Sequence, residues 1–230
     1  MTEQVAGTSE LLRWSESLAA LARTGLAFSA SAFERERYEE ILRIAADIRV
    51  AADHPGERPT TGALVEEWMS AVRPGVAGYV TPRVSVGAIV GNARGELLLI
   101  RRPESGVWLY PTGWADVGYS AAEVAEKEVA EETGIEVVAE RLVMVIDGLR
   151  LGMSKAPLYS LVFHCRSVGG TLARHPLECL DAGWFGPDAL PEPLAGADRW
   201  ADHAFAAIRG EDVGVLFDRP RAPTWRGAPR

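Results

Sequence analysis

Three glutamates that could bind a metal ion lie close together in the middle of the chain, at Glu128, Glu131 and Glu132. Residues three and four positions apart project from neighbouring turns of one helix face. Like charges at this spacing repel by about 0.2–0.5 kcal/mol per pair in a helix, so the cluster indicates a compensating cation. Carboxylate oxygens are ligands for hard divalent cations. The sequence therefore predicts a divalent metal site on this helix.

A single helix is expected to carry these glutamates. Ser120 and Glu123 form the S-x-x-E pattern of a capping box, which predicts the start of the helix. Gly134 predicts its end, because glycine readily takes the left-handed conformation that terminates helices. A solvated acidic helix on the protein surface would carry the same local signals. The helix alone therefore does not separate a metal site from an exposed acidic face.

The run from Gly113 to Ile135 resembles the Nudix box, G-x5-E-x7-R-E-U-x-E-E-x-G-U, where U is an aliphatic residue. The positions that match in register are Gly113, Glu128, Val129, Glu131, Glu132, Gly134 and Ile135. Tyr119 replaces the first glutamate, Lys127 replaces the arginine, and Thr112 replaces the glycine that commonly precedes the box. Lysine lacks the planar fork with which arginine can orient a carboxylate. These departures leave open the number of bound metal ions and the turnover rate more than the type of reaction.

The resemblance implies a fold and a reaction. The fold is an α/β/α sandwich with a mixed β-sheet, and the reaction is hydrolysis of the pyrophosphate in a nucleoside diphosphate linked to another group X. Magnesium is the implied ion, with manganese as the alternative. The implied metal ligands are Glu128, Glu131 and Glu132, with a backbone carbonyl of Gly113 or Thr112. A nucleoside monophosphate would be one product.

The general base and the substrate contacts are less tightly specified. Family members draw the base either from the box or from a later loop, where Glu178 is the first candidate and Asp181 the second. An exposed loop carboxylate is the competing interpretation for both. Expected substrate contacts flank the box, at Arg101, Arg102, Trp114 and Tyr119. The arginines could bind phosphate oxygens, and the aromatic rings could stack on a base or enclose a quaternary ammonium.

Composition excludes several other classes of protein. A formal charge of −8 and a pI near 5.1 disfavour a nucleic-acid partner bound by a broad basic surface. The sequence has neither a signal-peptide pattern nor an apolar run long enough for a membrane span. The two cysteines, Cys165 and Cys179, are expected to be free thiols in a reducing cytosol. We therefore expect a cytoplasmic enzyme acting on a small nucleotide.

The chain divides into three expected parts. Residues 1–72 form an N-terminal helical domain, with two helices in 9–50 separated at Gly25, a polar connector at 53–62 and a short helix before Pro74. This segment resembles the helical domain ahead of some bacterial Nudix hydrolases, which implies a homodimer. Residues 73–212 form the Nudix domain, with strands at 84–91, 96–102, 141–148, 158–168 and 181–186 and a helix at 198–208. Residues 213–230 are an expected disordered tail.

The sequence leaves the identity of X and the competing functions open. Some Nudix enzymes with a similar helical leader act on CDP-choline, and ADP-ribose is the nearest competing substrate. A Nudix domain that binds a nucleotide without hydrolysing it, as a sensor or assembly module, is the alternative that Tyr119, Lys127 and Thr112 suggest. The retained glutamates argue against it. A dedicated biosynthetic role is a third hypothesis.

Overall fold

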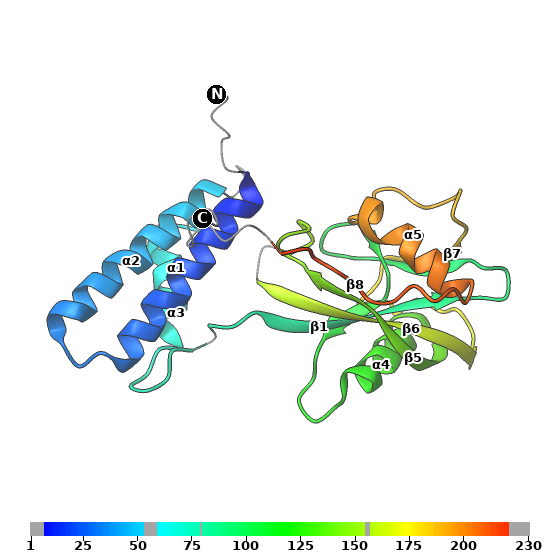
Figure 1. The fold of residues 1–230 in the computed structure, drawn as a ribbon, viewed down its shortest axis with the longest axis horizontal. Coiled ribbons are helices and arrows are strands. Elements are labelled where there is room, and N and C mark those ends of the chain that lie inside the picture. The colour runs from blue at the N-terminus through cyan, green and yellow to red at the C-terminus, as the bar shows by residue number, and fades with distance from the viewer. Residues whose placement is uncertain (1–6, 53–58, 79, 155–156, 221–230) are drawn as a thin grey trace, which may run out of the picture. The chain divides into compact units, whose positions relative to one another are not determined.

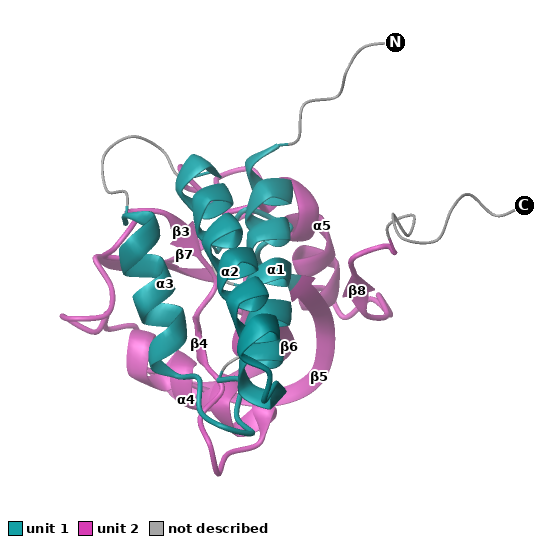
Figure 2. Cartoon of the chain, turned by 90° about the vertical axis from the view of Figure 1, so that its left-hand side faces the viewer, with its two compact units in different colours: residues 1–84, 147–159 teal, residues 85–146, 160–230 magenta. Residues whose placement is uncertain are grey.

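The computed structural model describes residues 7–52, 59–78, 80–154 and 157–220. It consists of two compact units, shown in Figure 2. Unit 1 comprises residues 1–84 and 147–159, and unit 2 comprises residues 85–146 and 160–230. Among the described residues, no helix has both the length and the apolar character needed to cross a membrane.

Unit 1 is built on three helices, α1 (Thr8–Phe28), α2 (Ala32–Ala52) and α3 (Thr61–Ser70), which are labelled in Figure 1. Thr60 caps α3, because its side chain accepts a hydrogen bond from the Ala63 amide. Small residues let α1 and α2 approach closely around a core of Ala19, Ala22, Leu26, Leu42, Ala45, Ala46, Leu64 and Trp68. The three predicted helices are confirmed.

The predicted helix break at Gly25 is wrong. α1 continues through this residue to Phe28, and the Ser29 amide closes its last turn on the Gly25 carbonyl at 2.8 Å. A Cβ atom at position 25 would lie 2.3 Å from the Tyr38 ring. Glycine is therefore needed for close packing of α2 on α1, and not for a turn between two helices.

Gly25→Ala is expected to lower the free energy of unfolding by about 1–2 kcal/mol. Displacement of the Tyr38 ring costs about 1–3 kcal/mol, while the better helix propensity of alanine returns up to about 1 kcal/mol. The matched control is Gly62→Ala in α3, where the nearest atom to a new Cβ is 4.0 Å away. Denaturant titration should show destabilisation only at position 25, and equal stability of both variants would contradict the packing role.

The strands form one eight-stranded mixed sheet in the order β3-β2-β1-β6-β5-β8, with β4 on β1 and β7 on β2. Their bounds are β1 (Arg83–Gly91), β2 (Leu97–Arg101), β3 (Trp108–Leu109), β4 (Thr112–Trp114), β5 (Ile135–Asp147), β6 (Leu158–Gly170), β7 (Asp181–Phe185) and β8 (Leu216–Phe217). β1 and β2 are antiparallel, and β5 and β8 are parallel. Residues 97–100 of β2 are fully buried, as expected for a strand covered on both faces.

Helices α4 (Ala121–Thr133) and α5 (Ala197–Ile208) lie on opposite faces of the sheet in Figure 1. The apolar side of α4 packs into a core of Val86, Ala88, Val90, Leu98, Val124, Ala125, Val129, Ile135, Val137 and Cys165. On the other face, Trp200 of α5 packs edge to face on Tyr110, with ring centroids 5.1 Å apart. This layering is the predicted α/β/α sandwich.

Most of the predicted elements of unit 2 are present, with three differences. β5 begins at Ile135, directly after α4, so the strand predicted from Arg141 is only its second half. The two- and three-residue strands β3 and β4 were not predicted, because such short segments carry no periodic signal. β8 lies within the predicted tail 213–230 and pairs with β5. Residues 221–230 of that tail and 53–58 of the predicted connector lie outside the described residues.

Candidate active site

Helix α4 begins and ends where the sequence predicts. Its first turn is closed by a reciprocal pair of hydrogen bonds: the Glu123 amide donates to Ser120 Oγ at 3.3 Å, and the Ser120 amide donates to Glu123 Oε2 at 2.6 Å. Gly134 ends the helix with φ 69°. Because both ends of α4 are defined, the helical turns that carry the three glutamates are defined as well. Strand β4 lies close to these turns.

Glu132 is buried and already bonded, with its side chain only 3% exposed. The Thr112 amide donates to its Oε2 at 3.0 Å, and Arg102 Nη1 lies 3.3 Å from its Oε1. The same Arg102 nitrogen donates to the Thr112 carbonyl at 3.1 Å. Burial raises the pKa of Glu132 to about 8, although Arg102 and the Thr112 amide act in the opposite direction. Glu132 therefore ties the start of β4 to α4.

Glu128 lies against Gly113 of β4. A Cβ atom at position 113 would be 2.2 Å from the Glu128 carboxyl group, so glycine opens the space that this side chain occupies. Burial raises the pKa of Glu128, and the negative charges of Glu131, Glu178 and Asp116 raise it further against the opposing effect of Lys127. The half-buried Glu128 carboxyl thus lies in a locally negative field.

Glu131 is half exposed and forms an ion pair with Lys127, whose Nζ lies 3.0 Å from Glu131 Oε2. Lys127 also contacts Asp116 Oδ2 at 3.1 Å. These hydrogen bonds raise the pKa of Lys127, so the lysine stays charged. The residue that departs from the box pattern therefore compensates the charge of two carboxylates, one of which, Asp116, was not predicted from the sequence.

The three glutamates of α4 have different partners in the structure. Glu132 contacts Arg102 and β4, Glu131 contacts Lys127, and Glu128 lies beside Gly113. Within the described ranges, no three or more His, Cys, Asp or Glu side chains are grouped closely enough to hold a metal ion among them. The oxygen donors of Glu128, Glu131 and the adjacent backbone are nonetheless of the type that binds hard divalent cations. The ion pair with Lys127 is made by Oε2 of Glu131, the other carboxylate oxygen being Oε1.

The two candidate general bases, Glu178 and Asp181, have different surroundings in the structure. Glu178 is exposed, but its charge raises the pKa of both Glu128 and Glu132, which places it in the field of the cluster. His175 Nδ1 lies 3.8 Å from Glu178 Oε2. Asp181 begins β7, pairs in register with Arg101 and accepts a hydrogen bond from the next amide. Of the two candidates, Glu178 is the one whose charge acts on the box glutamates.

The predicted substrate contacts also differ in their surroundings. Arg101 is exposed and donates through Nε to the Gly106 carbonyl at 2.9 Å, whereas Arg102 is engaged with Glu132. Trp114 and Tyr119 are 50% and 56% exposed, which leaves both rings accessible beside the box. Trp108, by contrast, is buried against the Phe185 ring, with centroids 5.0 Å apart, so it belongs to the core.

Two family models match the chain. One, described as a NUDIX domain, matches residues 81–207, and the other, described as a UDP-X-like N-terminal oligomerisation domain, matches residues 9–57. The first therefore covers strands β1 to β7, α4 and all but the last residue of α5. The second covers α1 and α2.

Two of three individual relatives match nine-tenths or more of the chain, and the third matches a smaller part. A putative ADP-ribose pyrophosphatase, YjhB of Bacillus subtilis (strain 168), is 28% identical over 211 residues, which are 90% of this chain and 96% of that protein. The crystal structure of a UDP-X diphosphatase is 26% identical, with a TM-score of 0.54 and coverage of 93% of this chain and 100% of that chain. An ADP-ribose pyrophosphatase from Streptococcus suis 89-1591 is 31% identical, with a TM-score of 0.52 over 60% of this chain and 100% of that chain. Since the NUDIX model spans more than half of the 230 residues, the chain belongs to the Nudix hydrolase family.

Proposed function

We propose that this Nudix hydrolase cleaves the pyrophosphate of a nucleoside diphosphate joined to a second group X, releasing a nucleoside monophosphate. The observation that carries the proposal is the Glu128 carboxyl held against Gly113 on a helix whose start and end match the box. The relatives that span the whole chain are named for ADP-ribose and UDP-X. ADP-ribose, UDP-X compounds and CDP-choline are therefore the substrates to test.

A divalent cation, Mg²⁺ or Mn²⁺, fits the oxygen donors of Glu128 and Glu131 together with the Gly113 carbonyl. When bound, such an ion neutralises charge on the phosphoryl oxygens and lowers the pKa of water. We favour the Gly113 carbonyl because the Thr112 carbonyl already accepts from Arg102. Since both Glu132 oxygens have partners in the structure, we assign Glu132 to positioning β4 rather than to direct ligation.

Residues around α4 are assigned to proton transfer and to substrate binding. We assign Glu178 as the group that accepts the proton of the attacking water, and this assignment is supported by its exposure and by its charge effect on Glu128. Arg101, at the end of β2, supplies a positive charge for phosphate oxygens. The exposed rings of Trp114 and Tyr119 supply flat surfaces for the base or for X.

The nucleotide sensor remains the competing function, and the ion pair of Lys127 with Glu131 is the observation that favours it. A lysine that satisfies Glu131 reduces the need for a metal at that carboxylate. Binding of a nucleotide diphosphate without cleavage would support the sensor. Cleavage that requires a divalent cation would support the hydrolase, because it shows that the cation competes successfully with Lys127.

A substrate panel tests the proposed reaction and identifies X. The full chain is incubated with ADP-ribose, CDP-choline, UDP-sugars and nucleoside triphosphates, each with Mg²⁺, with Mn²⁺ and with chelator. We expect one class of diphosphate to yield a nucleoside monophosphate with either metal but not with chelator. Equal product with metal and with chelator would contradict the proposed site.

Gly113→Ala is expected to lower kcat by about 10- to 100-fold, in the range seen when a group that orients a metal ligand is lost. The new Cβ would lie 2.2 Å from the Glu128 carboxyl, and this flexible side chain would be displaced more easily than the backbone. Circular dichroism should show that the fold is kept. The control is Gly186→Ala, where no atom lies within 4 Å of a new Cβ and the backbone is not left-handed. Full activity of Gly113→Ala, or an equal loss in Gly186→Ala, would contradict the role of Gly113.

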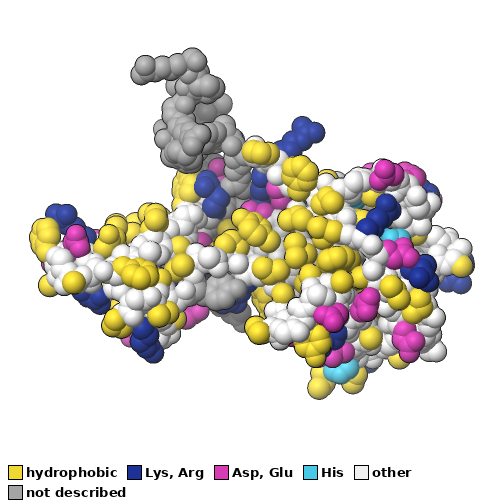
Figure 3. Space-filling view, turned by 60° about the horizontal axis from the view of Figure 1, so that its bottom comes forward, with side chains coloured by type: hydrophobic (Ala, Val, Ile, Leu, Met, Phe, Trp, Pro, Cys, Tyr) yellow, Lys and Arg dark blue, Asp and Glu magenta, His cyan; other side chains and the backbone are white. Residues whose placement is uncertain are grey.

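We also propose that unit 1 associates with a second copy of the chain through one exposed side of α1. Trp14, Leu21 and Phe28 are 41%, 66% and 67% exposed. Their seven-residue spacing places them in a line along the helix. Figure 3 shows hydrophobic side chains exposed among charged ones over the helices of unit 1. The match of this segment to an oligomerisation domain supports a homodimer.

Leu21→Glu is expected to shift the protein from dimer to monomer, because it would place a charge in the centre of this apolar line. Light scattering after size-exclusion chromatography measures the change in mass. Ala63→Glu is the matched control, since it adds the same side chain at an exposed position of α3. A wild-type monomer, or a dimer unaffected by Leu21→Glu, would contradict the proposed surface.

A further inference from the structure

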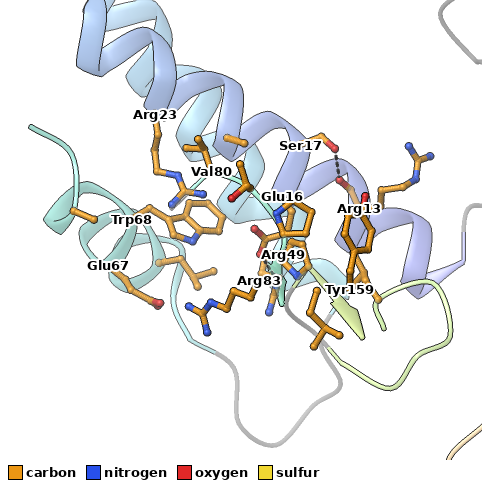
Figure 4. Close-up of a pocket in the computed structure, with 18 of the residues that line it drawn as sticks. Arg13, Glu16, Ser17, Arg23, Arg49, Glu67, Trp68, Val80, Arg83 and Tyr159 are labelled. Atoms are coloured by element: carbon orange, nitrogen blue, oxygen red, sulfur yellow. Dashed lines mark hydrogen bonds and ion pairs between the residues drawn. The ribbon is translucent and has the colours of Figure 1, made fainter. Parts of the chain in front are cut away.

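Buried side-chain nitrogens without a hydrogen-bond partner lie in both units of the described part of the chain. In unit 1 the atom is Arg13 Nε. Arg13 lines a cavity shown in Figure 4, and its guanidinium lies 5.9 Å from the centroid of the Trp14 ring, which attracts the charge. In unit 2 the atoms are His164 Nδ1 and His175 Nδ1. His175 is the one that lies beside the proposed general base, Glu178.

The backbone at His175 is attached to the end of the box helix. The Ala173 amide donates to the Thr133 carbonyl at 2.9 Å, and the His175 amide donates to the Glu132 carbonyl at 3.0 Å. The last carbonyls of a helix have no partner within that helix, so these two hydrogen bonds complete the end of α4. The position of His175 relative to the box glutamates is therefore fixed by the backbone.

A single turn connects His175 to Glu178. The Cys179 amide donates to the His175 carbonyl at 3.1 Å, and the Leu180 amide donates to the Arg101 carbonyl at 2.8 Å. Side chains three residues apart on a helical turn project to the same side. The backbone of this turn is thus held at both ends, whereas the Glu178 side chain is 52% exposed and can rotate.

The histidine nitrogen and the carboxylate are separated by a short gap. His175 Nδ1 lies 3.8 Å from Glu178 Oε2, which is too long for a hydrogen bond. No other described cationic side chain forms an ion pair with Glu178. A shift of the exposed carboxylate by about 1 Å would bring the two atoms within hydrogen-bond distance. It would also give the buried Nδ1 the acceptor that it lacks.

We propose that His175 is a positioning residue for Glu178, with its Nδ1 donating a hydrogen bond that fixes the orientation of the carboxylate. The inference rests on the proposed hydrolysis with Glu178 as the base. An exposed glutamate has many side-chain orientations, and one fixed partner restricts them before the reaction begins. Neutral histidine suits this role, because one of its ring nitrogens donates a proton to a hydrogen bond while the carboxylate keeps the charge that a base needs.

His175→Ala is expected to lower kcat by about 10- to 100-fold, in the range for a misplaced catalytic group. KM should stay unchanged, because Glu178 acts on the attacking water and not on substrate binding. His175→Asn should recover most of kcat, since its side-chain amide donates from nearly the position of Nδ1. The matched control is His164→Ala on β6, because His164 Nδ1 lies 3.5 Å from Glu140 Oε2 on β5 and neither strand carries a box glutamate. It should keep full kcat.

A cycle of single and double variants shows whether His175 acts through Glu178. Glu178→Gln is expected to lower kcat by about 100- to 10,000-fold, the usual contribution of a general base. Adding His175→Ala to this variant should cause no further loss, because no base is left to be positioned. Losses that multiply would overturn the inference. Wild-type kcat in His175→Ala, or a His175→Asn variant as slow as His175→Ala, would overturn it as well.

The tautomer of His175 tests the contact without any turnover. Proton–nitrogen correlation spectra, recorded at a pH where the ring is neutral, distinguish a proton on Nδ1 from one on Nε2. We expect the Nδ1–H tautomer in the wild type and the Nε2–H tautomer in Glu178→Met, which removes the acceptor. The Nε2–H tautomer in the wild type would overturn the inference. A wild-type protein that cleaves no diphosphate would contradict the proposed function, and the tautomer would still decide whether His175 donates to Glu178.

Discussion

Glu128→Gln is expected to reduce kcat for metal-dependent hydrolysis by about 100- to 1,000-fold, the scale of losing one group that stabilises charge in a transition state. The change keeps the size of the side chain but removes the negative charge that would hold a cation next to Gly113. Thermal unfolding should show that the protein still folds, because Glu128 forms no ion pair with another described residue that the variant would break. Product release at a Mg²⁺ concentration that saturates the wild-type protein measures the loss.

Glu66→Gln is the control for this variant, since it makes the same chemical change at an exposed position of α3. We expect it to keep full activity. Raising the Mg²⁺ concentration should recover part of the activity of Glu128→Gln if the lost function is metal affinity. Wild-type turnover in Glu128→Gln at every Mg²⁺ concentration would remove Glu128 from the metal site.

Arg102→Met is expected to lower the free energy of unfolding by about 2–4 kcal/mol. Arg102 lies 3.3 Å from the buried Glu132 carboxyl and donates to the Thr112 carbonyl at 3.1 Å. Methionine retains much of the packing but leaves Glu132 with only the Thr112 amide as a partner. Because the Arg102 charge opposes the effect of burial, its loss should raise the pKa of Glu132 further. Denaturant titration measures the change in stability.

Two comparisons isolate the contact between Arg102 and Glu132. Arg101→Met alters the neighbouring exposed arginine, whose bond to the Gly106 carbonyl is local, and should cost less than about 1 kcal/mol. The double variant Arg102→Met with Glu132→Gln should be less destabilised than the sum of the single variants, because they remove one shared interaction. Additive losses would show that Arg102 stabilises the fold independently of Glu132.

The parts of the site that depend on local sequence were predictable. The start of α4 was predicted from the capping box of Ser120 and Glu123, and its end from the left-handed Gly134. Both features are present in the structure. The long apolar or alternating strands were likewise found near their predicted positions, except that β5 begins at Ile135 rather than at Arg141. Nearest-neighbour geometry is sufficient for these features, because caps, turns and side-chain periodicity depend on residues close in sequence.

Partners far apart in sequence could not be predicted. Arg102 and Glu132 are 30 residues apart, and their contact depends on how β2, β4 and α4 are packed. Arg102 was predicted to contact the substrate, whereas in the structure its guanidinium pairs with Glu132 of the box. The requirement for Gly25 likewise comes from Tyr38 on the next helix, and the pairing of β8 comes from β5.

The spacing of the three glutamates predicted that they share one side of α4, but it did not predict the partner of each carboxylate. A shared helix side does not give the carboxylates a shared partner, because each side chain responds to its own surroundings. The buried Glu132 and the half-exposed Glu131 have different neighbours although they are adjacent in sequence. Their different burial follows from the rotation of about 100° between successive helical residues, which turns one toward β4 and the other toward solvent.

Phosphorus NMR of the intact diphosphate substrate, followed over time with the wild-type protein, tests the central claim most directly. It observes the phosphoanhydride itself and separates binding from cleavage in one sample. We predict that Mg²⁺ converts the paired diphosphate resonances into two monophosphate resonances, and that chelator stops the conversion. Diphosphate resonances that broaden or shift on binding but never convert, for every substrate of the panel, would contradict hydrolysis and establish the nucleotide-binding module instead.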